Sequence, residues 1–318
     1  MRTYLVLVLL MITFTIVPCP VLGQSDFPNK PITVIVPMAP GGAADLTSRL
    51  IGKAAEKYLG QSVVIVNKTG GAGTVGTAAL AAAKPDGYTL GTLVTSPIMT
   101  VPHVTKLTYH PVKDLEAIIQ HSVLNFAVSV RSDSPFMTFK EIIEYARKNP
   151  GVVTYGTSGT NSAQHILMEQ IAREEKVEWI QVPFKGGPEI LSAMMGGHVS
   201  LAATDFSPSL YKAKKMRSLA MFLNERWSEH PDIPTLRELG YQVLVPYFVG
   251  VGAPKGVPEP IMKKLEDAFS KAYQDPEFSQ GMKTMGLLPA FYRNRKDFSA
   301  FIAKSFEEMG KYIQELKK

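Results

Sequence analysis

Short apolar runs alternate along the chain with longer segments in which apolar residues recur at helical spacing. The runs at 32–36, 63–66 and 88–94 are rich in β-branched residues and end at glycine, proline or hydroxyl turns, which is typical of buried strands. Further strands are predicted at 118–119, 126–130, 152–155, 179–182, 199–203, 216–221 and 247–253. Amphipathic helix patterns lie between them, for example at 138–148 and 189–195. Strands that alternate with helices predict an α/β fold with mainly parallel sheets.

The polar turns that end these strands form two groups far apart in the sequence, which indicates two lobes with a ligand cleft between them. The run at 126–130 is predicted to cross from the first lobe to the second, and the run at 247–253 to return. We therefore expect one lobe from residues 24–125 together with 246–318, and another from residues 126–245. Each lobe is expected to hold a sheet flanked by helices.

The stretch from Val34 to Arg49 contains the turn Pro40-Gly41-Gly42 between a predicted strand and a predicted helix, with Asp45 in the first helical turn. Backbone N–H groups at such a turn point outward beside the positive end of the helix dipole, which suits a carboxylate or a phosphate. The alternative is an ordinary strand–helix connection that binds nothing. A second turn of the same kind favours the ligand site.

That second turn follows the predicted strand at 152–155. It offers five hydrogen-bonding side chains although helix capping needs only one, and a histidine lies in the first turns of the next helix. The residues are Thr157, Ser158, Thr160, Asn161, Ser162 and His165. This excess of small polar groups suits the oxygens of a polar ligand. The alternative is a hydroxyl-rich loop that faces water.

Ser158 and His165 also allow a secreted serine hydrolase as an alternative function. The hydrolase motif G-x-S-x-G is broken here, because Thr160 stands in place of its last glycine. A histidine on a helix beside Ile166 and Met168 is more often packed than catalytic. The six histidines show no spacing suited to a metal site. We therefore expect a protein that is not an enzyme and binds no metal.

Gly71, Gly73 and Gly76 spell G-x-G-x-x-G between a predicted strand and a predicted helix, as in dinucleotide-binding proteins. That motif requires an acidic residue about 20 positions later to hold the ribose. The corresponding window, 92–96, contains no acid. We therefore interpret the glycines as allowing close helix–strand packing, and we expect no nucleotide cofactor.

Three further polar turns end predicted strands, at Thr95-Ser96, at Phe184-Lys185-Gly186 and at Thr204-Asp205. Ligands of α/β sheets bind beyond the carboxyl ends of the strands. All the polar turns described above lie at that end of their strands, so they are expected to face one cleft.

Residues 1–23 resemble a secretory signal peptide, with Arg2, an apolar run from Tyr4 to Val17 and a small-residue end suited to cleavage before Gln24. Cys19, which is the only cysteine, offers a lipoprotein anchor as the alternative, but Pro18 fits a lipidation signal poorly. The whole sequence is 45% hydrophobic with a net charge of +6, and its basic residues are scattered rather than clustered. We expect a periplasmic protein that binds no nucleic acid.

Several short motifs occur in the order found in one known family, from Phe27 to the C-terminal helices. They are Phe27-Pro-x-Lys-Pro-Ile, Val36-Pro-x-x-Pro-Gly-Gly-x-x-Asp, Asn67-x-x-Gly-Gly-x-Gly-x-x-Gly, Lys84-Pro-Asp-Gly-Tyr, Tyr155-Gly-Thr-Ser-Gly with His165, Val182-Pro-Phe-Lys-Gly, Met195-Gly-Gly-His-Val, and Asp232-Ile-Pro-Thr with Glu238-x-Gly240. Each motif alone is weak, but together they resemble the substrate-binding receptors of tripartite tricarboxylate transporters, also called the Bug family. The chain departs from the family at Pro246-Tyr247-Phe248, where a tryptophan is usual, and at His110 and Val101.

The resemblance implies a type II periplasmic-binding fold that closes on a small carboxylate. In this family the loops corresponding to 37–45 and 157–165 hold one ligand carboxylate through backbone groups and water. The other end of the ligand is then expected to meet variable positions, for which we nominate Met38, Ser96, Phe184 and Asp205. Asp205 would favour an amine or hydroxyl on the ligand and disfavour a second carboxylate, or it would serve as a helix cap or an inter-lobe contact.

The resemblance also implies a monomeric receptor that delivers its carboxylate to the integral membrane permease subunits of a tripartite tricarboxylate transporter. The expected ligand-binding residues are Met38, Pro40, Gly41, Gly42, Asp45, Thr95, Ser96, Thr157, Ser158, Gly159, Thr160, Asn161, Ser162, His165, Phe184, Lys185, Gly186 and Asp205. The sequence does not select one carboxylate.

Overall fold

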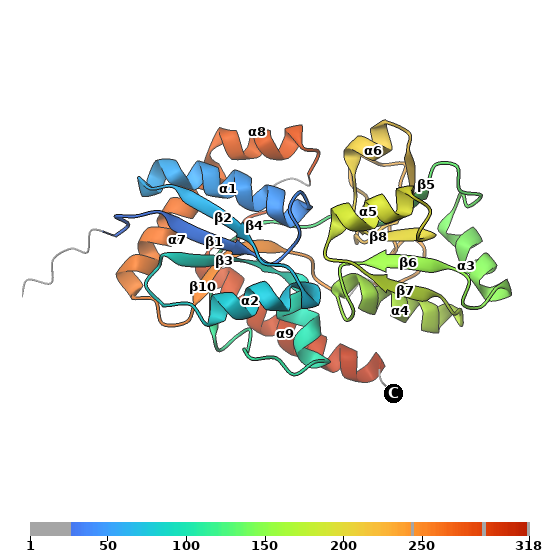
Figure 1. The fold of residues 1–318 in the computed structure, drawn as a ribbon, viewed down its shortest axis with the longest axis horizontal. Helices are drawn as coiled ribbons and strands as arrows, with labels where there is room; N and C mark the ends of the chain where they lie inside the picture. The colour runs from blue at the N-terminus through green and yellow to red at the C-terminus, as the bar shows by residue number, and fades with distance from the viewer. Residues whose placement is uncertain (1–26, 243–244, 288–290, 317–318) are drawn as a thin grey trace, which may run out of the picture.

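The computed structural model describes residues 27–316 except 243–244 and 288–290. The predicted signal peptide, 1–23, and Cys19 lie outside the described residues. Two lobes stand side by side, one drawn mainly in blue, cyan, orange and red, the other in green and yellow (Figure 1). Each lobe is a sheet covered by helices on both faces, so the predicted two-lobe α/β fold is confirmed.

The first lobe contains a five-stranded sheet in the order β2-β1-β3-β10-β4. Its strands are β1 (Ile32–Val36), β2 (Val63–Asn67), β3 (Thr89–Val94), β4 (Leu115–Ser122) and β10 (Val249–Pro254). β1 pairs in parallel with β2 and β3, whereas β10 is antiparallel to both β3 and β4. The sheet is therefore mainly parallel, with one reversed strand that returns from the other lobe.

Helices cover both faces of this first sheet (Figure 1). They are α1 (Ala43–Leu59), α2 (Thr74–Ala81), α7 (Glu259–Gln274), α8 (Pro276–Thr284) and α9 (Arg295–Leu316). The short helical turn η1 (Gly71–Gly73) leads from β2 into α2, and the turns η2 (Ser96–Thr100) and η3 (Val101–His103) lie between β3 and β4. The glycine motif has a packing role, because a Cβ on Gly76 would lie 2.6 Å from the Lys68 carbonyl oxygen and 2.8 Å from Pro37 Cα.

The second lobe repeats this plan with a five-stranded sheet in the order β7-β6-β8-β5-β9. Its strands are β5 (Phe126–Arg131), β6 (Thr154–Thr157), β7 (Ile180–Pro183), β8 (Leu201–Asp205) and β9 (Met216–Met221). β6 is parallel to β7 and β8, and β5 is antiparallel to β8 and β9. The helices are α3 (Phe139–Lys148), α4 (Ala163–Glu175), α5 (Gly187–Met195) and α6 (Pro208–Lys212).

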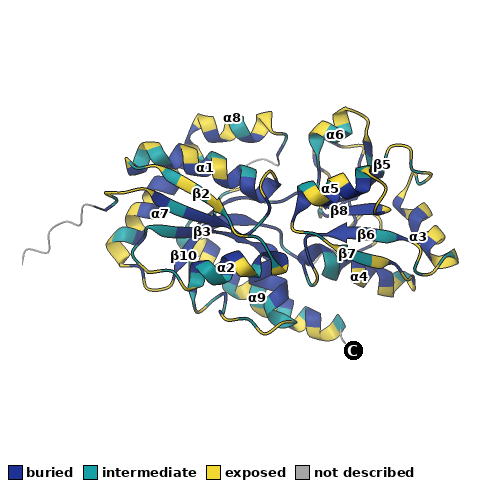
Figure 2. Cartoon of the chain, viewed as in Figure 1, coloured by how far each residue is buried: buried dark blue, intermediate teal, exposed yellow. Residues whose placement is uncertain are grey.

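Burial explains why the apolar runs become strands. All residues of β10 are buried, as are nearly all of β4, whereas the edge strand β2 alternates between half-buried and exposed positions. In Figure 2 the central strands are dark blue and the outward faces of the helices are yellow. Continuous apolar runs thus form the central strands, which are covered on both sides.

The chain passes between the lobes at 123–125, which joins β4 to β5, and again between β9 and β10. The C-terminal helix α9 adds a third link, because the Tyr312 hydroxyl donates a hydrogen bond to the Gln170 side chain on α4. None of the helices in the described part of the chain is long and apolar enough to span a membrane.

Candidate functional site

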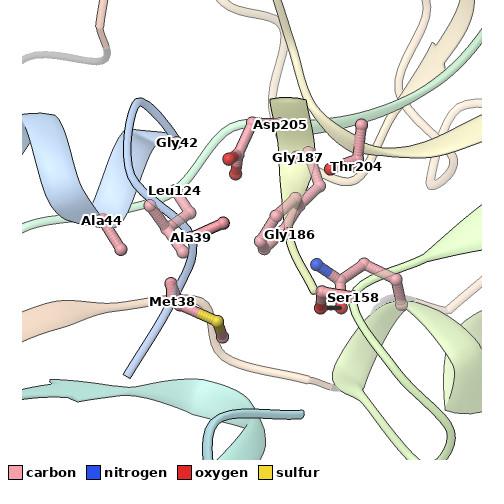
Figure 3. Close-up of a pocket in the computed structure, with 12 residues that line it drawn as sticks. Met38, Ala39, Gly42, Ala44, Leu124, Ser158, Gly186, Gly187, Thr204 and Asp205 are labelled. Atoms are coloured by element: carbon pink, nitrogen blue, oxygen red, sulfur yellow. Dashed lines mark hydrogen bonds between the residues drawn. The ribbon is translucent and has the colours of Figure 1, made fainter. Parts of the chain in front are cut away.

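The two lobes enclose a cavity of about 30 Å³ where four strand–helix connections meet (Figure 3). Its wall is formed by Met38, Ala39, Gly42, Ala44, Leu124, Phe126, Ser158, Gln164, Gly186, Gly187, Thr204 and Asp205. Since this volume accommodates only about one or two water molecules, an organic ligand enters only when the lobes separate. We call this space the inner cavity.

The turn before α1 is held in place by Asp45. Its buried carboxylate accepts hydrogen bonds from the Gly41 N–H at 2.9 Å, from Arg49 Nε at 2.9 Å and from Asn67 Nδ2 at 2.8 Å. Burial opposes ionisation of Asp45, but the hydrogen bonds from Arg49, Gly41 and Asn67 outweigh it and lower the pKa of the carboxyl. Asp45 therefore shapes the loop, and it is absent from the wall of the inner cavity.

The start of α1 has no side-chain cap of its own. The cap position is Gly42, which has no side chain to accept a hydrogen bond from the helix. The Ala43 N–H donates instead to Asp205 Oδ2 in the other lobe at 3.1 Å. An acidic group at a helix start is favourable, because the first N–H groups carry partial positive charge. Asp205 thus joins the lobes at this point.

Burial raises the pKa of Asp205 to about 6, and the hydrogen bond from the Ala43 N–H offsets only part of this effect. The carboxylate lines the inner cavity and also a second space of about 180 Å³ on its other side, which is walled by Gly41, Leu46, Pro188 and residues 206–209. In Figure 3 Asp205 lies at one end of the pocket and Ser158 at the other.

The turn before α4 is hydrogen-bonded within itself and largely buried, although Thr160 is exposed and Asn161 is half-buried. Thr157 and Ser162 are fully buried, and Ser158 is 6% exposed. The Thr157 hydroxyl donates to the Gly159 carbonyl oxygen at 3.2 Å, and the Ser162 hydroxyl caps α4 by accepting from the His165 N–H at 3.3 Å. Among these hydroxyls, only that of Ser158 lines the inner cavity.

Ser96 makes a contact between the lobes, whereas Thr95 binds the returning segment 246–248 of its own lobe. Ser96 Oγ accepts a hydrogen bond from the Ala163 N–H at the start of α4 at 3.1 Å. Thr95 Oγ1 donates to the Pro246 carbonyl oxygen at 2.8 Å and accepts from the Phe248 N–H at 3.1 Å, which ties β3 to the returning segment. Both residues lie outside the wall of the inner cavity.

A third space of about 430 Å³ lies between the glycine turn 70–73 of the first lobe and the second lobe. Five of the predicted site residues line it: Ser158, Gly159, Thr160, Phe184 and Lys185. Ser158 belongs to both this space and the inner cavity. Pro40 is exposed, and the Asn161 carbonyl oxygen accepts from the Thr100 hydroxyl at 2.9 Å.

The lobes are closed on each other in this structure. A Cβ added to Gly186 would lie 2.7 Å from Ala39 Cβ in the opposite lobe, closer than real Cβ atoms approach a neighbour. Gly159 lies against Ala72 of the first lobe in the same way, since a Cβ there would come within 3.0 Å of the Ala72 backbone nitrogen. Only glycine fits at these two positions of the closed cleft.

Ser158 and His165 do not form a nucleophile–base pair. The Ser158 hydroxyl donates to Gln164 Oε1 at 3.2 Å, and His165 Nδ1 accepts from the Asn161 N–H at 3.0 Å. No hydrogen bond joins Ser158 to His165 within the described ranges. Burial lowers the pKa of His165, although Glu169 acts in the opposite direction.

Sequence reasoning placed five residues of the cavity wall: Met38, Gly42, Ser158, Gly186 and Asp205. It missed the other seven, which are Ala39, Ala44, Leu124, Phe126, Gln164, Gly187 and Thr204. Gln164 lies within the predicted loop 157–165 and Thr204 within the predicted turn Thr204-Asp205, although neither was named among the expected ligand-binding residues. Leu124 and Phe126 carry no polar signal and lie on a chain crossing.

Comparison with known proteins identifies the family. The model described as "Tripartite tricarboxylate transporter family receptor" matches residues 47–317. A Cupriavidus necator relative, described as "UPF0065 protein in gbd 5'region", is 35% identical over 299 residues, which is 93% of this chain and 91% of the relative.

Two solved structures share the whole fold. A protein of R. palustris solved with adipate has a TM-score of 0.84 and 26% identity, and the alignment covers 92% of this chain and 99% of that chain. MatC of Rhodopseudomonas palustris with bound malate has a TM-score of 0.81 and 27% identity, with 90% and 99% covered. The chain therefore belongs to the tripartite tricarboxylate transporter receptor family, a family of solute receptors rather than of enzymes, as its motifs predicted.

Proposed function

We propose that the protein captures a small organic carboxylate in the cleft between its lobes and delivers it to the permease subunits of a tripartite tricarboxylate transporter. The proposal places the receptor in the periplasm as a monomer, after removal of residues 1–23. The lobes are proposed to comprise residues 24–125 with 246–318, and residues 126–245. The strands of the two sheets fall on either side of these limits.

This proposal rests on the inner cavity, which lies between the lobes at the starts of α1, α4 and α5. The loops 37–45 and 157–165 are proposed to offer backbone N–H groups to the ligand, while Ser158 and Gln164 place neutral polar side chains in the wall. Such groups bind an anion without a lysine or arginine, directly or through water. The adipate and malate complexes of two relatives show that carboxylates bind to proteins of this fold and family.

Of the residues predicted from sequence, we propose that Met38, Gly42, Ser158, Gly186 and Asp205 contact the ligand, since they line the inner cavity, which widens when the lobes separate to admit it. The Asp45, Thr157 and Ser162 side chains act indirectly by holding the two loops in shape. Gly159, Thr160, Phe184 and Lys185 are proposed to meet ligands that extend out of the inner cavity.

A thermal-shift and calorimetric screen of the purified protein against small carboxylates tests the proposal. A ligand at about 100 times its dissociation constant stabilises the folded protein by about 2.7 kcal/mol, which raises the melting temperature by a few degrees. The substitution Ser158→Phe fills the inner cavity and should abolish the shift. Ser192→Phe, at an exposed position of α5, is the control and should preserve it.

Turnover of esters or amides that is lost in Ser158→Ala would contradict the receptor function. Delivery to a permease is tested in cells, where deletion of the receptor gene should abolish uptake of the radiolabelled ligand. Normal uptake after deletion would contradict the transport part of the proposal while leaving ligand capture standing.

A further inference from the structure

Asp205 is the sole ionisable residue among those that line the inner cavity. Around it the wall is apolar at Met38, Leu124 and Phe126, and neutral at Ser158, Gln164 and Thr204. The strand β8 ends at Asp205 and thereby places its carboxylate at the closed interface of the lobes. A carboxylate is unexpected in the wall of a site that binds carboxylate ligands, because two such charges repel each other.

The charge of Asp205 has little compensation in the closed structure. The Ala43 N–H is its one hydrogen-bond donor among the described residues, and none of their ion pairs includes Asp205. A carboxylate offers about four lone-pair sites, so most of its acceptor capacity is unused. Burying a carboxylate without a cationic partner is costly, and the raised pKa of Asp205 reflects that cost.

The other charged groups near this end of the cleft are already engaged or lie elsewhere. The Asp45 carboxylate on α1 is bound by Gly41, Arg49 and Asn67. Lys185 lines the 430 Å³ space and is absent from the inner cavity. No side-chain cation among the described residues therefore pairs with Asp205.

The opposite end of the inner cavity offers donors. Gln164 is 2% exposed, its side-chain oxygen accepts from the Ser158 hydroxyl, and its side-chain NH₂ takes part in no hydrogen bond of the described chain. A ligand carboxylate placed here would accept from this NH₂ group. The cavity thus has a donor end and an acidic end.

We propose that Asp205 selects ligands that carry an ammonium group in addition to their carboxylate, so that the ligand class is a small zwitterionic amino acid. This inference rests on the proposed function and adds the class of ligand that the receptor selects. The ligand carboxylate lies at the Gln164 end, and the ammonium group pairs with Asp205. Malate or adipate would instead bring a second negative charge toward Asp205, which disfavours dicarboxylates.

The same pairing would make closure more favourable when the ligand is bound. Without a ligand, closing the lobes removes the half-buried Asp205 carboxylate from part of its water, with one N–H to compensate it. With a zwitterion bound, the ammonium group supplies a cation, and closure becomes more favourable.

Calorimetry with matched acids tests the proposal on the purified protein. The panel contains the common L-amino acids, the acids that lack only the amino group, and the dicarboxylates malate and adipate. We expect one or more amino acids to bind at least about 30-fold more tightly than their deaminated counterparts, as for a desolvated charge pair. Asp205→Asn, which keeps an oxygen to accept from Ala43, should reduce this preference to about threefold or less.

Asp275→Asn serves as a control, because Asp275 is also a helix-capping carboxylate but belongs to α8 and lies outside the cavity wall. It should lower stability without changing the ligand preference. Equal weakening of amino and deaminated acids by Asp205→Asn would overturn the proposal and leave Asp205 as an inter-lobe contact only. Tight binding of a dicarboxylate without any amino acid ligand would also overturn it, whereas binding of no carboxylate at all would refute the proposed function itself.

Discussion

The helix starts of α1 and α4 face each other across the cleft, and each is completed by a side chain from the opposite lobe. The Ala43 N–H at the start of α1 donates to Asp205 of the second lobe. The Ala163 N–H at the start of α4 donates to Ser96 of the first lobe. Both distances are 3.1 Å, so the two contacts are geometrically alike. They differ in charge, because one acceptor is a carboxylate and the other a hydroxyl.

The two helix starts also differ in how much they rely on the other lobe. α1 begins at Gly42, which offers no side chain, whereas α4 begins at Ser162, whose hydroxyl already satisfies the His165 N–H. The α1 start thus stays open to a ligand or to Asp205, and the α4 start is largely complete within its own lobe. The charged contact is therefore the one through which ligand chemistry can control closure.

The largest effect is expected where the lobes touch most closely, at Gly186. In Gly186→Ala the new Cβ would lie 2.7 Å from Ala39 Cβ, so the lobes cannot reach the closed position. Ligand affinity should fall at least about tenfold, because overpacking of a close contact costs 1–3 kcal/mol. Calorimetric titration measures this loss, while the melting temperature of the ligand-free protein should change little, since opening relieves the clash.

Gly42→Ala is the matched control for that variant. A Cβ on Gly42 would meet its nearest neighbours, the Ala39 carbonyl oxygen and Asp205 Oδ2, at 3.5 Å, which is ordinary contact. Affinity should therefore change much less than in Gly186→Ala. Equal losses in the two variants would show that the glycines matter for loop flexibility rather than for the approach of the lobes.

A second effect, of intermediate size, is expected from the charge of Asp205. Because burial raises its pKa from 3.8 to about 6, the closed structure is favoured when the group is protonated, and this contribution is lost as the pH rises through about 6. Asp205→Asn removes the dependence. In the absence of ligand the variant should become more stable than the parent protein by up to about 2 kcal/mol at pH 7.5, and the gap should close below pH 4.

Thermal unfolding of the two proteins between pH 4 and pH 8 measures that gap. All other titrating groups, including Asp45 on the neighbouring helix α1, are present in both proteins, so the difference isolates Asp205. A constant gap across the pH range would mean that the carboxylate stays fully ionised in the closed structure.

Much of the fold could be predicted because turns and apolar runs are local signals. The glycine, proline and hydroxyl turns mark the carboxyl ends of strands, and these ends meet in one cleft whenever the sheets are mainly parallel. The two reversed strands, β5 and β10, are the crossings that the pattern predicted at 126–130 and 247–253.

The candidate site was predictable only in part, because the sequence shows to which turn a residue belongs but not which groups its side chain contacts. Asp45 lies in the predicted turn, yet its carboxylate is directed into its own lobe by Arg49 and Asn67. Ser96 lies at a predicted strand end, yet it meets α4 rather than the inner cavity. Such roles depend on how two lobes dock, and no local pattern encodes that geometry.

The smallest effect is expected at the neutral contact, and it would complete the comparison of the two helix starts. Ser96→Ala removes the acceptor for the Ala163 N–H only when the lobes are closed, so it should weaken ligand binding by about 0.5–1.5 kcal/mol, the usual contribution of one neutral hydrogen bond. Calorimetry should give the same loss at pH 5 and at pH 7.5, because no titrating group takes part.

Ser162→Ala provides the counterpart within a single lobe. It removes the cap of α4 and should lower the free energy of unfolding by about 1 kcal/mol, while leaving ligand affinity nearly unchanged, since the cap forms in open and closed lobes alike. If Ser96→Ala instead lowered stability and spared affinity, the Ser96–Ala163 contact would persist in the open receptor. Closure would then depend on the charged contact of Asp205 alone.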